Sequence, residues 1–232
     1  MTTKSDDEVK LIGAWPSPFV LRARVALNLK SVKYEFLQEN FAPKSQLLIQ
    51  SNPVYKKIPV LIHGDKPICE SLIIVEYIDE AWSSGPSILP SHPYDRAIAR
   101  FWSSYIDDKW FPAMKSIAGA AGDDEKKKLI EEVGEGLALL EDALKKISKG
   151  KDYFGGDQIG YLDIAFGGFL GWLRVTEASI GVKLLNEATT PGLLNWAHKF
   201  AAHHAVKDVL PETGKLLEFA KVLMARNANA AK

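Results

Sequence analysis

Hydrophobic and polar residues follow two different periods along this chain. Up to about residue 82, short apolar runs alternate with stretches of helical spacing, which is typical of an α/β unit. The expected strands are 9–13, 34–38, 59–62 and 67–69, and the expected helices are 19–29 and 71–82. The turn His63-Gly64-Asp65-Lys66 between the last two strands predicts a β-hairpin. Ser71 is expected to cap the second of these helices.

The later part of the chain has helical patterns only. The expected helices are 94–118, 124–149, 162–176, 192–202 and 214–226. The stretch 83–93 gathers serine, glycine and three prolines, a composition typical of an extended linker. We therefore expect an α/β domain at 1–83, a linker at 84–93 and an all-helical domain at 94–232.

Two local features are expected inside the helical domain. Gly160-Tyr161-Leu162-Asp163 opens a helix, so the carboxylate of Asp163 should meet free backbone amides in a structural role. Pro112 interrupts the first long helix, and a kink there would reshape any neighbouring pocket.

Composition and charge exclude several classes of function. Lysine plus arginine and aspartate plus glutamate number 29 each, so no bulk field attracts nucleic acid or an anionic membrane. The single cysteine, Cys69, excludes an internal disulfide and is interpreted as a small buried hydrophobe. His198, His203 and His204 lack the spacing of a metal site. The polar start, 1–8, lacks the apolar core of a secretory signal, and no run is long enough to span a bilayer, so we expect a cytoplasmic protein.

Ser17 is the main candidate for chemistry. It lies between two prolines, after a strand and at the start of a helix, where backbone amides create a positive potential. That potential would lower the pKa of a ligand thiol from about 8.5, and a serine hydroxyl that donates to sulfur would stabilise the thiolate. The alternative is that Ser17 only caps the helix, and the pattern alone leaves both interpretations open.

Other residues in the first domain could bind the two ends of an amino acid. Glu70-Ser71 offers a carboxylate for an ammonium group, and a hydroxyl and helix amides for a carboxylate. Lys44 and Lys57 could pair with a second carboxylate, although surface lysines are often only solvated. Ile58-Pro59 enters a strand where a cis bond could expose backbone to a ligand, but the residues alone favour trans.

Taken together, these motifs resemble those of the tau class of plant glutathione transferases. The resemblance covers nearly the whole chain. The matching segments are Trp15-Pro16-Ser17-Pro18-Phe19, Lys44-Ser45, Asn52-Pro53-Val54, 56–63, Glu70-Ser71, Ile74, 77–80, Ala99-Arg100-Phe101-Trp102 and 160–164. The resemblance implies an α/β thioredoxin-like N-terminal domain that binds glutathione, and an all-α C-terminal helical domain that supplies most of a hydrophobic pocket.

The resemblance also implies a role for each matching residue. Ser17 would activate the thiol, and Arg22 and Asp107 would polarise the γ-glutamyl site. The expected glutathione-binding residues are Lys44, Lys57, Ile58, a cis Pro59, Glu70 and Ser71. The expected electrophile-binding residues are Trp15, Phe19, Phe111, Lys115, Trp172, Phe219 and Leu223, although Trp172 and Phe219 could equally be core.

The implied function is a homodimeric enzyme that joins glutathione to hydrophobic electrophiles. Peroxidase activity on organic hydroperoxides is a possible side reaction, and no cofactor or metal is expected besides glutathione as co-substrate. A thiol oxidoreductase on the same fold would need a cysteine where Ser17 stands. A non-catalytic carrier of hydrophobic metabolites remains an alternative, and an interaction module is disfavoured by the glutathione contacts.

Overall fold

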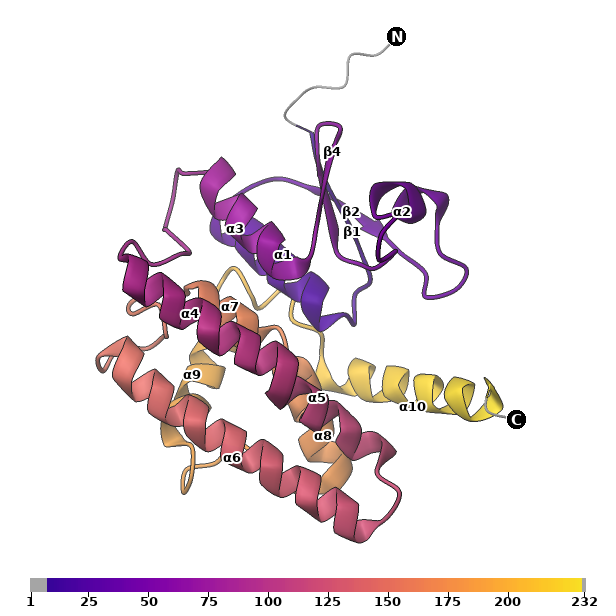
Figure 1. Ribbon diagram of the computed structural model, residues 1–232, viewed down its shortest axis with the longest axis vertical. Helices are drawn as coiled ribbons and strands as arrows, with labels where there is room; N and C mark the ends of the chain where they lie inside the picture. Colours follow the sequence, from indigo (N-terminus) through magenta and orange to yellow (C-terminus); the bar gives the residue numbers. More distant parts are fainter. Residues whose placement is uncertain (1–7, 231–232) are drawn as a thin grey trace.

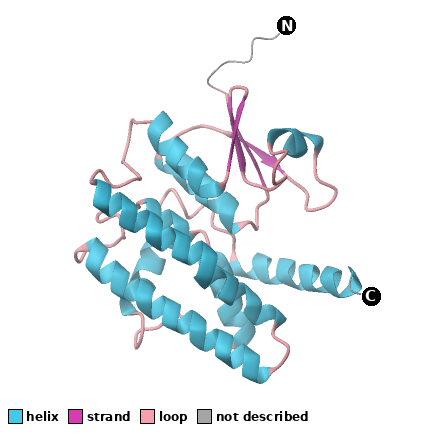
Figure 2. Ribbon diagram, viewed as in Figure 1, coloured by secondary structure: helices cyan, strands magenta, loops and turns pink. Residues whose placement is uncertain are grey.

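The computed structural model of the protein describes residues 8–230, with side chains as far as residue 225. Figure 1 shows an α/β unit above a larger group of helices, with the C-terminal helix α10 extending to one side. The strands are confined to the upper unit (Figure 2). This is the two-part architecture that the sequence predicts.

One four-stranded sheet forms the centre of the first unit. Its strands are β1 (Val9–Gly13), β2 (Glu35–Gln38), β3 (Val60–His63) and β4 (Lys66–Cys69). Their order is β2-β1-β3-β4, with β1 parallel to β2 and antiparallel to β3. β3 and β4 form the expected hairpin, in which Val60 lies opposite Cys69. The expected strands are confirmed to within about one residue at each end.

Helices cover both faces of the sheet. α1 (Pro18–Leu29) and α3 (Ser71–Ala81) pack together on one face, where Leu11 of β1 joins the main core. α2 (Gln46–Ser51) contributes Leu48 to a second cluster with Ile12 and Val60. Successive residues of a strand point to opposite faces, so Leu11 and Ile12 serve the two cores.

The second unit is all helical. Its elements are α4 (Pro93–Tyr105), the π-helical turn η1 (Ile106–Trp110), α5 (Phe111–Ser116), the short 3₁₀ turn η2 (Ile117–Gly119), α6 (Asp123–Ser148), α7 (Tyr161–Gly167), α8 (Leu170–Ile180), α9 (Pro191–Ala202) and α10 (Thr213–Ala230). No helix among residues 8–230 is long and apolar enough to cross a membrane.

Four details of the secondary structure differ from the sequence-based expectations. No helix is expected between the strands 34–38 and 59–62, but that stretch contains the short helix α2, which has too few residues to show a period. Glu70, and not Ser71, is the N-cap of α3. The expected first long helix is divided by η1, a wider turn directly before Pro112, which has no backbone N–H to donate.

The fourth difference is the division of the expected helix 162–176 into α7 and α8. Gly167 and Gly168 lie at the break. A Cβ atom on Gly167 would lie 2.1 Å from the Phe200 ring, and one on Gly168 would lie 2.8 Å from the carbonyl oxygen of Pro18. The glycine pair therefore allows α9 and α1 to approach the break closely.

Candidate functional site

Ser17 is the N-cap of α1. Its backbone is extended, and its Oγ accepts a hydrogen bond of 3.3 Å from the Val20 N–H. The first turn of the helix, Pro18-Phe19-Val20, is uncharged. A hydroxyl has one donor hydrogen and two acceptor lone pairs, so capping leaves the hydrogen free to donate. The two interpretations of Ser17 that the sequence leaves open are thus compatible with each other.

Arg22, one turn further along α1, connects the two units. Its guanidinium is fully buried and forms a two-pronged ion pair with Asp107 of η1, at 2.9 Å and 2.5 Å. The same group donates to Ser71 Oγ at 3.2 Å and to the Ala165 carbonyl oxygen at 3.1 Å and 2.8 Å. The geometry brings Arg22, Asp107 and Ser71 together, as the sequence analysis expects. Their roles toward a ligand stay a prediction.

Glu70 precedes Ser71 with an unusual backbone. Its φ of 71° and ψ of 121° lie in a region that side-chain-bearing residues rarely adopt. Such a conformation costs on the order of 1–3 kcal/mol and persists where the surroundings impose it, often at a binding site. The exposed Glu70 carboxylate is therefore held at the start of α3, next to the Ser71 hydroxyl.

Lys44 and Lys57 lie on two adjoining loops. Lys44 Nζ donates to the carbonyl oxygen of Lys56 at 2.8 Å, and both Lys44 and Lys57 are exposed. The buried side chain of Asn52 holds the second loop, because it donates to the carbonyl oxygen of Lys57 at 3.0 Å and accepts from the Tyr55 N–H at 3.1 Å. Asn52 thus shapes the loop that carries Lys57.

A buried carboxylate holds the first loop, and the sequence analysis missed it. Glu39 is 5% exposed and accepts from the Asn40 N–H, the Ser45 N–H and the Ser45 hydroxyl, at 3.1, 2.9 and 2.5 Å. These hydrogen bonds join Glu39 to Ser45 and so hold the loop between them, in which Lys44 lies. A charged residue directly after β2 was the available signal, but nothing in the pattern indicated burial.

The Ile58-Pro59 peptide bond is cis. The expectation from the residues alone, a trans bond, is wrong here, and the expectation from the family resemblance is right. Ala42-Pro43 is also cis, which the sequence analysis did not anticipate. Cis and trans X-Pro bonds differ by about 0.5–1 kcal/mol, so surrounding structure decides between them.

Aromatic side chains from both units meet beside Ser17. The Phe219 ring of α10 lies 5.6 Å from Trp15, 5.4 Å from Phe41 and 6.5 Å from Trp172, centroid to centroid. Trp172 also donates from Nε1 to the Pro16 carbonyl oxygen at 2.7 Å. This wall therefore joins the loop before α1 to α8 and α10. Phe41, which the sequence analysis missed, belongs to the wall.

A second aromatic group gathers around Phe19, in the first turn of α1. Phe19 packs edge-on against Phe111 and Phe169, at 5.8 Å and 5.5 Å, and Phe111 stacks on Phe169 at 4.1 Å. Phe169, also missed, lies under the Arg22 guanidinium at 4.7 Å. Lys115 is exposed on α5, and among the residues that the structure describes it has no hydrogen bond, ion pair or cation–π contact with either aromatic group. Leu223 is half-buried on α10.

Burial sets the pKa of two other candidates. It raises the pKa of the half-buried Cys69 thiol, and Glu70 adds to the shift, so this thiol stays protonated near neutral pH. Burial also raises the pKa of Asp163 to about 6, against the opposing effect of hydrogen bonds from the backbone N–H groups of Gly160, Gly155 and Phe154 and from Trp196 Nε1. Asp163 is fully enclosed, which fits the structural role expected for it.

No cluster of metal-binding side chains is found in the part of the chain that the structure describes. Within residues 8–230, no three histidine, cysteine, aspartate or glutamate side chains are arranged to hold a metal ion. The rings of His203 and His204 lie 4.3 Å apart, tilted by 33° to each other. Burial lowers the pKa of His203, and His204 adds to the shift.

Comparison with known proteins gives the family. The model of the glutathione S-transferase N-terminal domain matches residues 7–80, and that of the C-terminal domain matches residues 101–204. Glutathione S-transferases U17 and U18 of Arabidopsis thaliana are 62% and 61% identical to this chain, over 96% and 95% of it and 98% and 97% of their own lengths.

Solved structures agree with this result. The tau class glutathione S-transferase of mango, Mangifera indica, is 68% identical, with a TM-score of 0.91 over 93% of this chain and 98% of that one. A rice glutathione transferase in complex with glutathione is 33% identical, with a TM-score of 0.86 over 95% of this chain and 98% of that one. Both family models, the close relatives and the shared fold agree: the chain belongs to the glutathione transferase family, in the tau class of plants.

Proposed function

We propose that this glutathione transferase uses the Ser17 hydroxyl to stabilise the glutathione thiolate. The observation that carries the proposal is the position of Ser17 at the N-terminus of α1, where Oγ accepts from Val20 and keeps its hydrogen for a ligand. The helix dipole favours a negative charge at this end. A thiolate held there would form a sulfur–carbon bond with an electrophile, and the leaving group would depart with the bonding electrons.

The rest of the glutathione molecule would lie along the edge of the first unit. Lys44 and Lys57, on adjoining loops, suit the glycyl carboxylate, and the backbone of Ile58 suits the cysteinyl unit. Glu70 and Ser71 suit the γ-glutamyl end, with the buried pair of Arg22 and Asp107 behind Ser71. These contacts take no part in the reaction, and most of their binding energy serves to position the glutathione sulfur.

The electrophile would lie against the aromatic wall. Trp15, Trp172 and Phe219 offer flat apolar surfaces next to the start of α1, where the sulfur is proposed to lie. Such surfaces accept planar apolar compounds without strict shape requirements. Reduction of organic hydroperoxides would use the same thiolate: its sulfur bonds to the outer peroxide oxygen as the O–O bond breaks, the alkoxide takes up a proton and leaves as the alcohol, and a second glutathione reacts with the resulting sulfenic acid to give glutathione disulfide and water.

Turnover with a chlorinated dinitrobenzene tests the role of Ser17. Ser17→Ala should lower kcat/KM by about 10²-fold or more, the size expected for removing a donor to developing or resident negative charge. Ser17→Thr keeps both the hydroxyl and the cap, so it should retain much of the activity. Ser179→Ala, which removes an exposed hydroxyl on α8, is the matched control. Unchanged turnover in Ser17→Ala would show that the assigned role is wrong, and ligand binding without turnover in the wild type would favour a carrier.

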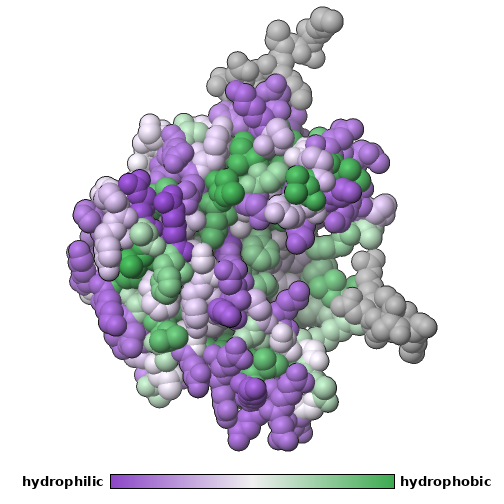
Figure 3. Space-filling model, in the orientation of Figure 1, coloured by the Kyte–Doolittle hydropathy of each residue, from purple (hydrophilic) through white to green (hydrophobic). Residues whose placement is uncertain are grey.

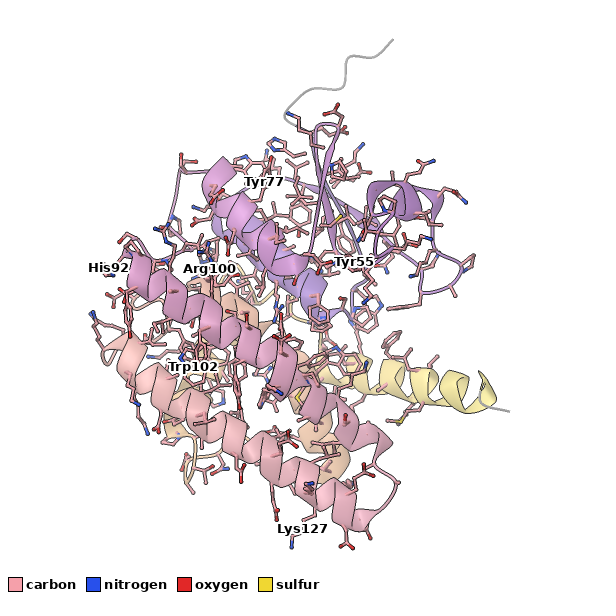
Figure 4. The ribbon with its side chains drawn as sticks, in the orientation of Figure 1. Tyr55, Tyr77, His92, Arg100, Trp102 and Lys127 are labelled. Atoms are coloured by element: carbon pink, nitrogen blue, oxygen red, sulfur yellow. The ribbon has the colours of Figure 1, made fainter. Side chains whose placement is uncertain are left out.

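A cytoplasmic homodimer is part of the proposal. Val54, Tyr55, Ile73 and Phe101 are each more than half exposed. They lie on the loop before β3, on α3 and on α4, and these two helices are at the front of the molecule in Figure 1. Figure 3, in the same orientation, shows hydrophobic residues among hydrophilic ones on this face. In Figure 4 the labelled Arg100 lies between the two helices, where it pairs with Glu76. Exposed apolar side chains beside an ion pair support an interface with a second copy. A monomeric mass by light scattering would contradict it.

A further inference from the structure

Phe41 is a member of the aromatic wall that lies outside the expected electrophile-binding residues. It lies on the loop between β2 and α2, whereas the expected residues lie at the start of α1, on α5, on α8 and on α10. The Phe41 ring centroid lies 5.4 Å from that of Phe219, and Phe41 is 47% exposed. The contact therefore joins a loop of the first unit to the C-terminal helix, and it leaves about half of the Phe41 surface accessible to a ligand.

The topology of the sheet places Phe41 next to Trp15. β1 and β2 are parallel neighbours, and their pairing ends at Gly13 and Gln38. Trp15 follows shortly after Gly13 and Phe41 shortly after Gln38, so both emerge at the carboxyl ends of the two strands, where α1 begins and where ligands commonly bind to α/β sheets. The Phe219 ring of α10 lies 5.6 Å from Trp15 and 5.4 Å from Phe41. In Figure 1, α10 passes below α2.

The backbone that carries Phe41 is held on both sides. The buried Glu39 carboxylate, before it in the loop, accepts from the N–H and the hydroxyl of Ser45 at 2.9 Å and 2.5 Å. Lys44, after it, donates from Nζ to the Lys56 carbonyl oxygen at 2.8 Å. A ligand that packs against a surface already held in place costs less conformational entropy to bind. Phe41 thus offers a positioned ring, although it lies on an exposed loop.

Aromatic walls select ligands by more than apolar area. A ring has a negative face and a positive edge, so a second ring that packs edge-on or offset gains stabilisation beyond the area that it buries. The planes of Trp15 and Phe41 are inclined by 66° and 38° to that of Phe219. Walls at different angles let one bound ring make both kinds of contact. An aliphatic chain buries apolar area in the same space but lacks the contribution from ring pairs.

We propose that Phe41 is a specificity-determining residue that makes the electrophile site prefer aromatic over aliphatic electrophiles. The assignment rests on the proposed function, in which Ser17 holds the glutathione thiolate at the start of α1. The ring of the electrophile packs against Phe41 and Phe219, and its reactive carbon reaches the sulfur. Phe41 takes no part in making or breaking bonds.

Two isothiocyanates that differ in one group test this role on the full-length protein. Benzyl isothiocyanate has a phenyl ring where allyl isothiocyanate has a vinyl group, and both react at the same carbon. The thiolate sulfur bonds to the central carbon of the N=C=S group, the electron pair of the C=N π bond moves to nitrogen, and nitrogen takes up a proton, so no group leaves. The ratio of kcat/KM for the benzyl compound to that for the allyl compound, corrected for the uncatalysed reaction, measures the preference for a ring.

Phe41→Leu keeps apolar bulk and removes the ring. This variant should lower the benzyl-to-allyl ratio about 3- to 10-fold, the effect of losing one aromatic pair, and should leave the KM for glutathione within about twofold of wild type. Phe41→Tyr keeps the ring, and its hydroxyl can reach water because position 41 is exposed, so it should retain the wild-type ratio. Tyr94→Leu removes an exposed ring at the start of α4 and is the matched control, for which we expect an unchanged ratio.

An unchanged ratio in Phe41→Leu would overturn the proposal. So would an equal loss of activity with both isothiocyanates and a higher KM for glutathione, because Phe41 would then only hold the loop that carries Lys44. In both cases, wild-type conjugation that depends on Ser17 would leave the proposed function standing. If the wild type conjugates neither compound, the proposed function is contradicted, and the assignment of Phe41 with it.

Discussion

Replacing Arg22 with methionine tests the link between the two units. Methionine has a similar length and fills the same core position, but it cannot donate hydrogen bonds. The change removes both bonds to Asp107, the bond to Ser71 and both bonds to the Ala165 carbonyl oxygen. That oxygen lies near the end of α7, where helix carbonyls lack intrahelical partners.

The expected loss in the free energy of unfolding follows from the bonds that Asp107 and the Ala165 carbonyl lose. Breaking a buried ion pair by removing one member costs about 3–5 kcal/mol, and the lower value applies because the Asp107 side chain is 27% exposed and can be rehydrated. The Ala165 carbonyl adds about 1–3 kcal/mol, because a buried acceptor is left without a donor. These terms overlap, so we expect a loss of about 4 kcal/mol in the free energy of unfolding.

Urea denaturation measures this loss, and steady-state kinetics with varied glutathione should show a raised KM because Ser71 is released. Arg24→Met is the matched control. Arg24 donates to the Tyr34 hydroxyl at 3.2 Å and is only half-buried, so its loss should cost under about 1 kcal/mol. Equal stability of the two variants, or a wild-type KM for glutathione in Arg22→Met, would show that Arg22 does not link the two units in this way.

Three further substitutions or conditions test other parts of the site. Glu39→Gln should raise the KM for glutathione about 3–10-fold and leave kcat nearly unchanged, because the loop that carries Lys44 loses its charged acceptor. A fall in kcat alone would contradict this. Since the pKa of Asp163 is raised from 3.8 to about 6, its contribution to stability is present below about pH 4 and is lost as the pH rises to about 6, a change of about 3 kcal/mol. Urea denaturation from pH 4 to 7 checks this change in the free energy of unfolding. Trp196→Phe removes one donor to the Asp163 carboxylate, so in this variant the loss of stability should extend above pH 6. Parallel curves of unfolding free energy against pH for the two proteins would be inconsistent with this. Trp172→Phe should raise the KM for the chlorinated dinitrobenzene and leave the KM for glutathione unchanged. The reverse pattern would show that Trp172 is not part of the electrophile site.

The sequence predicted those parts of the fold that depend on local periodicity. Leu21, Val25 and Leu29 form the buried stripe expected for α1, and the hairpin of β3 and β4 follows from its turn residues. The break between α7 and α8 was not predictable in the same way. It depends on the packing of Gly167 against Phe200, a contact between residues far apart in the chain.

In the candidate site, too, local features could be predicted from the sequence and contacts between distant residues could not. The position of Ser17 at the start of α1 could be predicted, because prolines and a strand mark the turn. Glu39 and Phe41 could not, since burial of the one and the contact of the other with Phe219 arise only when distant elements meet. The cis bond at Ile58-Pro59 was inferred from family resemblance and not from the residues, whose local preference is for trans.

The pKa of the glutathione thiol bound to the protein directly measures how far the protein stabilises the charge on sulfur. Ultraviolet absorbance of the thiolate, recorded against pH with enzyme in excess, gives this pKa for wild type and for Ser17→Ala. We expect the wild-type value to lie about one unit or more below the free thiol value of about 8.5, and the Ser17→Ala value to return toward it. Equal values for the two proteins would contradict the account.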